Sequence, residues 1–421
     1  MAEGAQAAGS GGRLEDYGQT MMTLQPPQRI LMGPGPSNVD YRVYRALTTP
    51  IVGHMDPEFM KIMDGVEARL RSVFRTANAV TIPVSGTGSA GMEAALVNFL
   101  EPGDLALVSS GGVFADRMCD IVERVGARLI KVEAEWGRAV EPEQVEAALR
   151  KAPGAVKLLA VVHGETSTGV LQPLEPLNRL AREAGALFVV DTVATLAGVP
   201  LDVDALAIDV CYSGSQKCLS CPPGLAPITL SARANDVVCS RRTKVQSWYL
   251  DLSMVEKYWG RERTYHHTAP ISMIYAFDEA LRLVLEEGLE ARWDRHARNM
   301  AALLAGLEAL GLQPLPPAGL RMPTLAAVLT PEGLDEAAIR SRLLSRYNIE
   351  IAGGLGKFRG KLWRIGLMGN SCTECNVLLV LAALETLLGE QGAIKAEGKG
   401  VAAAQRLYAT KAEASRSAQS L

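Results

Sequence analysis

The sequence is poor in aromatic residues, which make up only 5% of its 421 residues, whereas 48% of the residues are hydrophobic. This balance is typical of a compact α/β enzyme whose core is built from alanine, leucine and valine rather than from rings. The 40 glycines indicate many tight turns and close backbone approaches. A chain of this length exceeds what one hydrophobic core usually organises, so we expect two domains.

The sequence also lacks a strong excess of one charge and a long apolar run. A net charge of −3 gives no reason to expect nucleic acid or an anionic membrane as a partner. The longest apolar helix candidate, residues 377–388, contains Glu385 and is too short to cross a bilayer. We expect a cytoplasmic enzyme. The C-terminal Ser420-Leu421 lacks the basic residue of an S-K-L peroxisomal signal, but a peroxisomal or other organellar location is not excluded.

The seven cysteines are scattered, and no secretory signal precedes them, which favours free thiols in a reducing compartment. Two C-x-x-C pairs, Cys218 with Cys221 and Cys372 with Cys375, could in principle make one four-thiolate zinc site together, but buried or loop thiols that act as small hydrophobes are the favoured interpretation. The pairs lie far apart in the chain, and no histidine stands at ligand spacing near either. The pair His266-His267 lies in an aromatic, polar loop and is expected to be structural. We therefore expect no metal site.

The order of apolar and polar segments predicts two domains between two tails. Residues 1–28 are rich in Gly, Ala and Gln and are expected to be disordered. Residues 29–285 alternate short strands with helices, which indicates a mostly parallel sheet with helices on both faces. Residues 286–388 predict a smaller α+β domain, and residues 389–421 a solvated helix or a loose tail. The strands of the two domains are expected at 105–108, 128–132, 158–162, 187–190, 208–212, 324–329 and 362–365.

Two of these strands lead directly to residues that carry chemistry. The run 186–190 ends in Asp191, and the strand at 208–212 leads into a small polar segment that contains Lys217. The carboxyl ends of parallel strands meet at one edge of a sheet, where Thr166 is also expected. A lysine amine forms the Schiff base that binds pyridoxal phosphate, and a carboxylate keeps its pyridine nitrogen protonated. The pattern predicts an enzyme of the aminotransferase type.

Each of these residues has a simpler interpretation. Most lysines are surface residues, and an aspartate after a strand often caps the next helix. The glycine-rich segment 85–91 follows an apolar stretch and opens a helix, where free amides favour a phosphate, although such turns are also common connectors. The order of this turn, Asp191 and Lys217 along the chain favours the phosphate interpretation.

With these motifs in order, the chain resembles the class V, fold type I pyridoxal-phosphate aminotransferases, and most closely the alanine–glyoxylate and serine–pyruvate aminotransferases. The resemblance covers residues 31–388. It rests on the motifs at 33–38, 85–88, 92–104, 163–169, 212–217, 265–268, 353–356 and 364–367, together with Asp191.

The resemblance implies roles for individual residues. Lys217 holds the cofactor and moves the α-proton of the substrate, and Asp191 pairs with the pyridinium nitrogen. Arg364 grips the substrate carboxylate, near Ser37 and Asn38. The other expected cofactor contacts are Val193 and Phe114 on the ring faces, Thr166 near the phenolic oxygen, Gly88, Ser89 and Gln216 at the phosphate, and Tyr265 and Thr268 of the partner subunit in a homodimer with shared active sites.

The implied activity is transfer of an amino group from L-alanine, or from L-serine, to glyoxylate. Two departures bear on cofactor affinity: Phe114 stands where close relatives often have tryptophan, and Ser89 where some have histidine. Alternatives are a serine–glyoxylate aminotransferase, a class V desulfurase or hydrolase, and an inactive binding protein. A desulfurase needs a mobile cysteine near the small domain, and Cys372 and Cys375 follow Arg364 rather than lying in the expected loop.

Overall fold

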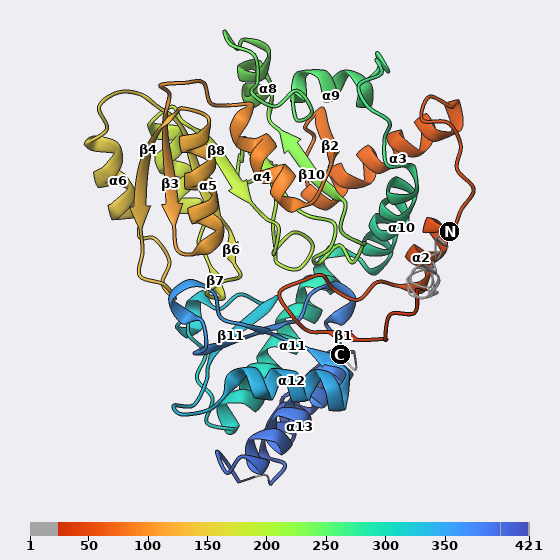
Figure 1. The fold of residues 1–421 in the computed structure, drawn as a ribbon, viewed down its shortest axis with the longest axis vertical. Coiled ribbons are helices and arrows are strands. Elements are labelled where there is room, and N and C mark those ends of the chain that lie inside the picture. The colour runs from red at the N-terminus through yellow and green to blue at the C-terminus, as the bar shows by residue number, and fades with distance from the viewer. Residues whose placement is uncertain (1–23, 396, 420–421) are drawn as a thin grey trace, which may run out of the picture.

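The computed structural model describes residues 24–395 and 397–419 and divides into a larger and a smaller part (Figure 1). A seven-stranded sheet forms the centre of the larger part. In spatial order its strands are β2 (Val80–Ser85), β10 (Leu225–Leu230), β9 (Val210–Tyr212), β8 (Leu187–Asp191), β5 (Val156–Val162), β3 (Leu105–Ser110) and β4 (Arg128–Glu133). Only β10 runs antiparallel to its neighbours. The predicted mostly parallel sheet is confirmed.

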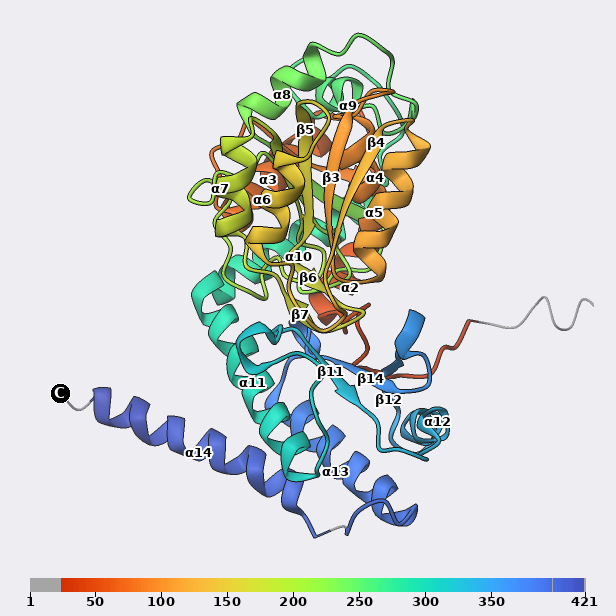
Figure 2. The same ribbon diagram turned by 90° about the vertical axis from the view of Figure 1, so that its left-hand side faces the viewer.

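Helices cover both faces of this sheet, which explains why β5 and β8 are apolar along almost their whole length. Figure 2 shows α4 (Gly88–Val97) and α5 (Val113–Arg124) on one face, and α6 (Pro142–Arg150) and α7 (Glu175–Glu183) on the other. The larger part also contains α2 (Tyr41–Leu47), α3 (Pro57–Phe74), α8 (Ala232–Cys239), α9 (Leu252–Trp259), α10 (Ile271–Glu287) and the short hairpin of β6 (Gly164–Glu165) and β7 (Val170–Leu171).

The smaller part is built on a three-stranded antiparallel sheet with its own hydrophobic core. Its strands are β11 (Leu325–Leu329), β14 (Leu362–Gly366) and β13 (Ala352–Gly353), and a separate parallel pair joins β1 (Ile30–Leu31) to β12 (Ile349–Glu350). Its helices are α11 (Leu289–Ala309), α12 (Glu336–Tyr347), α13 (Glu374–Glu390) and α14 (Lys399–Gln419), with 3₁₀ turns at Ala318–Leu320, Gly356–Phe358 and Gly369–Ser371.

The segments outside the predicted small domain contribute to its core. Met32 from the N-terminal side and Ala404 from α14 are both fully buried there. The C-terminal segment, which was expected to be a solvated helix or a loose tail, forms a helix whose N-terminal part packs against α11 and α13 (Figure 2). The division at residues 285 and 388 stays a prediction, and these contacts would add both segments to the smaller unit.

Two expectations concern the ends of the chain and the membrane. Most of the tail predicted at residues 1–28, and the last two residues, lie outside the described part of the chain. In the part that the structure describes, no helix is both long and apolar enough to cross a membrane.

Candidate active site

A cavity of about 80 Å³ lies where the carboxyl ends of the parallel strands meet. Asp191 ends β8, and the register of β8 and β9 places it beside Tyr212. Residues far apart in the sequence converge on this edge. Eight residues predicted from the sequence line the cavity: Gly88, Ser89, Phe114, Thr166, Asp191, Val193, Gln216 and Lys217. Met92, Val162, Gly164 and Ala194 complete its lining.

Asp191 is a buried carboxyl group, 3% exposed, whose two oxygens are both held in place. Oδ1 accepts a hydrogen bond from the Val193 amide (2.7 Å), and Oδ2 accepts one from the Tyr212 hydroxyl (2.8 Å). Burial raises the pKa of Asp191 to about 6, although both hydrogen bonds favour the charged form. A carboxylate fixed in this way is suited to pair with a protonated nitrogen inside the cavity.

Tyr212 is a site residue that the sequence reasoning did not single out. Its side chain is fully buried, and its hydroxyl contacts Asp191, a residue 21 positions earlier in the chain. The contact follows from the pairing of Asp191 with Tyr212 across neighbouring strands. The only signal in the sequence was a tyrosine at the end of an otherwise apolar strand.

Lys217 extends from the segment after β9 into the cavity, and its Nζ donates a hydrogen bond to the Pro34 carbonyl. Burial, with a smaller contribution from the positive charge of Arg364, lowers the pKa of Lys217 to about 8, while Cys218 and Asp191 act in the opposite direction. A fraction of the amine is therefore neutral near pH 7, and the neutral amine is the nucleophilic form.

The segment 33–38 packs against Lys217. A Cβ atom at Gly35, where φ is +100°, would lie 2.5 Å from the lysine Cδ, so this close approach requires glycine. Ser37 Oγ donates to the Lys217 carbonyl (2.8 Å), while Asn38 accepts from the Leu31 amide and donates to the Arg29 carbonyl (both 2.9 Å). These side chains fix the segment, and their contact with substrate stays a prediction.

The start of α4 has free backbone amides that are suited to bind a phosphate group. Gly88 and Ser89 are its first two residues, whose amides cannot bond within the helix, and the preceding Thr87 makes no side-chain cap. A Cβ at Gly88 would lie 3.0 Å from the Val193 side chain, so glycine keeps this part of the cavity open. Gln216 also lines the cavity, and its side-chain amide nitrogen can donate a hydrogen bond to a phosphate oxygen. The residues fit the cofactor.

Phe114 lines the cavity from the first turn of α5, which a buried carboxylate holds in place. Glu165 Oε2 accepts from the Phe114 amide (3.1 Å), and Oε1 accepts from the Ser167 amide (3.0 Å) and hydroxyl (2.6 Å). Glu165 thus connects the strand that precedes Thr166 with the helix that carries Phe114. The sequence reasoning included Glu165 in a motif but gave it no role.

Arg364 does not line the cavity, but it reaches it through Thr166. Its Nε donates to the Gly353 carbonyl (2.8 Å), and Nη1 lies 3.5 Å from the Thr166 carbonyl. The residue is 7% exposed and has no carboxylate within ion-pair distance in the described chain. Burial lowers the pKa of Arg364 to about 10. A buried guanidinium without an ion-pair partner, although the Glu165 carboxyl acts on it at longer range, is suited to bind the carboxylate of a ligand.

Tyr265 and Thr268 do not line the cavity of their own chain. Tyr265 is 57% exposed, and its hydroxyl lies 3.5 Å from Thr268 Oγ1. The neighbouring histidines make local contacts: their Nδ1 atoms lie 2.8 Å apart, and His267 Nε2 lies 2.8 Å from Ser85 Oγ. His266 also stacks on Trp248. The expected role of Tyr265 and Thr268 at a second subunit stays a prediction.

None of the cysteines lines the cavity or forms a disulfide. All seven are free, and Cys218, Cys221 and Cys372 are buried. Burial raises the pKa of the Cys372 thiol, which accepts a hydrogen bond from Asn299 Nδ2 (3.4 Å). Within the described ranges, no group of three or more His, Cys, Asp or Glu side chains could hold a metal ion.

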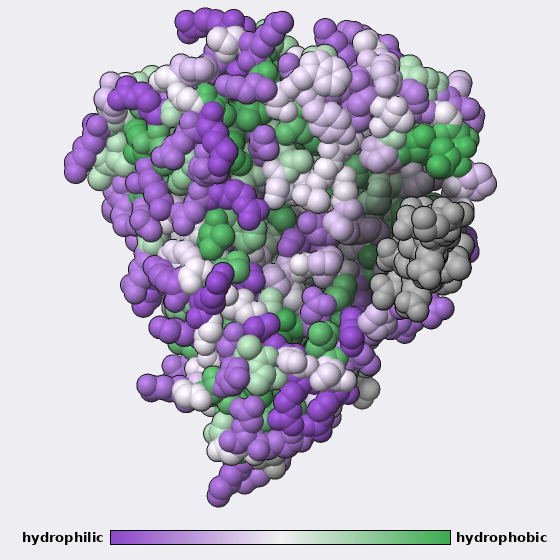
Figure 3. All heavy atoms as spheres, in the orientation of Figure 1, coloured by the Kyte–Doolittle hydropathy of each residue, from purple (hydrophilic) through white to green (hydrophobic). Residues whose placement is uncertain are grey.

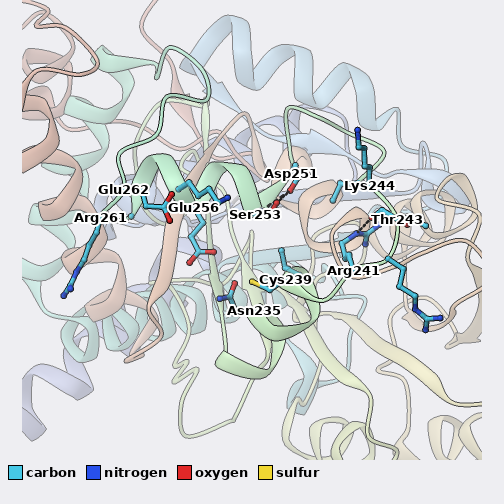
Figure 4. Close-up of a pocket in the computed structure, with 15 residues that line it drawn as sticks. Asn235, Cys239, Arg241, Thr243, Lys244, Asp251, Ser253, Glu256, Arg261 and Glu262 are labelled. Carbon is cyan, nitrogen blue, oxygen red and sulfur yellow. Dashed lines mark hydrogen bonds between the residues drawn. The ribbon is translucent and has the colours of Figure 1, made fainter.

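A larger cavity, of about 710 Å³, lies on the surface away from these residues (Figure 4). Side chains of α8, α9, the loop between them and the segment after α9 line it, and they mix cations such as Arg241 and Lys257 with acids such as Glu256 and Glu262. The Arg241 side chain is already bonded to the carbonyls of Asn98, Leu100 and Thr243. Because its charges do not converge on one point, we place the chemistry in the smaller cavity.

The fold and the smaller cavity together define an enzyme of fold type I that depends on pyridoxal phosphate. The sequence model of the family described as Aminotransferase class-V matches residues 38–357. The chain belongs to this family of aminotransferases.

Individual relatives cover most of the chain. It is 42% identical to (S)-ureidoglycine–glyoxylate transaminase of Bacillus subtilis over 91% of this chain and 96% of that protein. The crystal structure of the Bacillus enzyme covers 92% of this chain and 100% of its own, with a TM-score of 0.89. Alanine–glyoxylate aminotransferase of Callithrix jacchus is 43% identical (87% and 89% covered). The solved alanine–glyoxylate aminotransferase of Nostoc sp. is 46% identical (88% and 98% covered), with a TM-score of 0.85.

Proposed function

We propose that the enzyme transfers the amino group of L-alanine, or of L-serine, to glyoxylate, which gives glycine and pyruvate or hydroxypyruvate. The observation that carries this proposal is the buried guanidinium of Arg364, which has no carboxylate partner in the described chain and reaches the cavity at Thr166. Donor and acceptor each carry one carboxylate, and the planar fork of arginine binds such a group with two parallel hydrogen bonds. Relatives named for glyoxylate support the acceptor.

Pyridoxal phosphate, when bound, supplies an aldehyde that takes up the amino group and a ring that withdraws electrons from the reacting carbon. Lys217 would hold it covalently, and its Nζ, once free, would remove the proton from the α-carbon of the donor. Asp191 would keep the ring nitrogen protonated through its fixed oxygens. Arg364 would orient the donor and then glyoxylate by the same carboxylate contact.

The choice of donor depends on the polar side chains near Lys217. The Ser37 hydroxyl already donates to the Lys217 carbonyl, and the Asn38 side chain already bonds to the backbone of the segment before it. A short donor such as alanine needs no polar contact beyond its carboxylate, whereas a urea group would need several partners. The second candidate donor is (S)-ureidoglycine, because the Bacillus relative, which this chain covers over 96% of its length, is named for it.

We expect L-alanine to remove the visible absorption band of the bound cofactor, and glyoxylate to restore it. The measurement is the spectrum of the purified protein after addition of L-alanine, L-serine or (S)-ureidoglycine, each followed by glyoxylate. The rate of each spectral change gives the preference among donors. If only (S)-ureidoglycine bleaches the band, the donor is wrong and the acceptor stands. If glyoxylate fails to restore it, the acceptor is wrong.

Replacing Arg364 should weaken the binding of both substrates without releasing the cofactor. In R364Q the charge-assisted contact to the carboxylate is lost, so KM for alanine and for glyoxylate should rise about 10- to 100-fold. R364K keeps the charge but loses the planar fork of the guanidinium, so its KM values should lie between those of R364Q and the wild type. The visible spectrum of the holoenzyme checks the cofactor. R359K, at an exposed arginine nearby, is the matched control, and an unchanged KM in R364Q would refute the role.

The desulfurase alternative needs a reactive cysteine at the cavity. Cys372 is buried and Cys375 is exposed, and neither lines the cavity. Persulfide on either residue after incubation with cysteine would favour this alternative over transamination.

We also propose a homodimer in which Tyr265 and Thr268 of the partner subunit complete the phosphate site. Large apolar side chains are exposed in residues 41–55 and in residues 248–265, the second of which leads to Thr268. Exposed apolar patches often mark interfaces. They are Tyr41, Tyr44, Ile51, Met55, Trp248, Tyr249 and Tyr265. Figure 3 shows apolar groups at the right-hand edge, over the segment that leads into α3. Light scattering on the full chain would measure this, and a monomeric mass would contradict it.

A further inference from the structure

Arg117 is a cation at the rim of the cavity that neither the sequence motifs nor the roles proposed above include. It lies on α5, one turn after Phe114, and α5 packs beside α4 on the same face of the sheet (Figures 1 and 2). Its Nη1 donates a hydrogen bond to Ser89 Oγ (3.0 Å), and its Cζ lies 5.1 Å from the centre of the Phe114 ring. The guanidinium thus lies between the start of α4 and the ring.

The charge of Arg117 has no ion-pair partner among the acids of its own helix, although it acts on the buried Asp191 carboxyl at longer range. On the same helix, Asp116 pairs with Lys131 (3.0 Å), and Asp120 pairs with Arg124 (2.8 Å). In the part of the chain that the structure describes, no carboxylate lies within 4.0 Å of the Arg117 guanidinium, and its one hydrogen bond goes to a neutral hydroxyl. An exposed arginine is common, but one held in place by two contacts to cavity residues is pre-oriented.

The start of α4 supplies donors to a phosphate but no full charge. Its free amides and the helix dipole amount to a partial positive charge, whereas a phosphate monoester carries nearly two negative charges near pH 7. The cavity residues named for the phosphate, Gly88, Ser89 and Gln216, are neutral. Arg117 is a cation whose guanidinium contacts one of these residues, Ser89.

We propose that Arg117 binds the phosphate of pyridoxal phosphate directly, next to Ser89 Oγ, and so supplies the positive charge of the phosphate site. A second effect of the same side chain is to cover the outer face of Phe114. The direct contact of Arg117 depends on the phosphate of the cofactor. Its effect through Phe114 depends only on the cofactor ring. This inference holds for any amino donor.

The test compares the affinity of the cofactor-free full chain for pyridoxal phosphate and for pyridoxal, which lacks the phosphate. In R117Q the affinity for pyridoxal phosphate should fall about 10- to 100-fold, because a charge-assisted contact is lost. The affinity for pyridoxal should stay unchanged. R117K, which keeps the charge, should lose less than R117Q. R124Q, at an exposed arginine of the same helix that touches no cavity residue, should bind both compounds like the wild type.

Absorption or quenching of intrinsic fluorescence measures both affinities independently of turnover. An equal loss for both compounds in R117Q would overturn the proposal, since Arg117 would then act through Phe114. Unchanged affinity for pyridoxal phosphate would also overturn it. The wild type should lose affinity for pyridoxal phosphate as salt concentration rises, and R117Q should lose less, because screening acts on the charge that the variant lacks.

Discussion

Replacing Lys217 with alanine is expected to abolish transamination, with a loss of about a thousandfold or more in kcat/KM. The Nζ of Lys217 is the only side-chain amine that lines the cavity in the described chain. Its pKa, lowered to about 8 by burial, makes it able both to bond to an aldehyde and to accept a proton. Alanine provides neither function. The measurement is the steady-state rate with alanine and glyoxylate, together with the visible spectrum.

The K217A variant should still fold and should still bind pyridoxal phosphate without a covalent bond. Borohydride, which fixes the cofactor on the wild-type lysine, should fix none on the variant. Lys151, an exposed lysine at the end of α6, gives the matched control K151A, which should retain full activity. Activity of K217A within about tenfold of the wild type would contradict the role of this lysine, given the usual size of proton-transfer effects.

Lys217, Asp191 and the start of α4 were predictable because each depends on a local pattern. A strand that ends in a carboxylate and a glycine-rich turn that opens a helix are visible within about ten residues. The alternation of strands and helices then places them at one edge of a parallel sheet. The structure brings these residues to one cavity.

Contacts between distant segments could not be predicted in the same way. Tyr212 meets Asp191 through the register of β8 and β9, and Arg117 meets Ser89 through the packing of α5 on α4. Neither pairing leaves a periodic signal in one sequence. The buried side of α14 was also missed, because its alanine-rich pattern resembles that of a solvated helix until α11 and α13 are in place.

Replacing Asp191 with asparagine is expected to lower kcat about 100-fold or more, the usual size of the loss of one preorganised electrostatic contact. Asparagine has nearly the same shape, so the hydrogen bond from the Val193 amide can remain. It carries no charge, so it cannot keep the ring nitrogen of the cofactor protonated. The rate of the first half-reaction, followed by the loss of the visible band with alanine, measures the effect. D236N, at an exposed aspartate of α8, is the control.

The Y212F variant and the pH dependence of cofactor binding distinguish the effect of the charge of Asp191 from the effect of its position. Y212F removes one hydrogen bond to a charged group but leaves the carboxylate, so its kcat should fall only about tenfold.

In the cofactor-free protein, burial raises the pKa of Asp191 to about 6, so the carboxyl group is protonated below this pH. The wild type should therefore bind pyridoxal phosphate less tightly as pH falls through about 6, and D191N should lack this dependence. If D191N and the wild type show the same pH profile and rate, the charge of Asp191 is not what activates the ring, and the carboxyl group serves only to position Val193 and Tyr212.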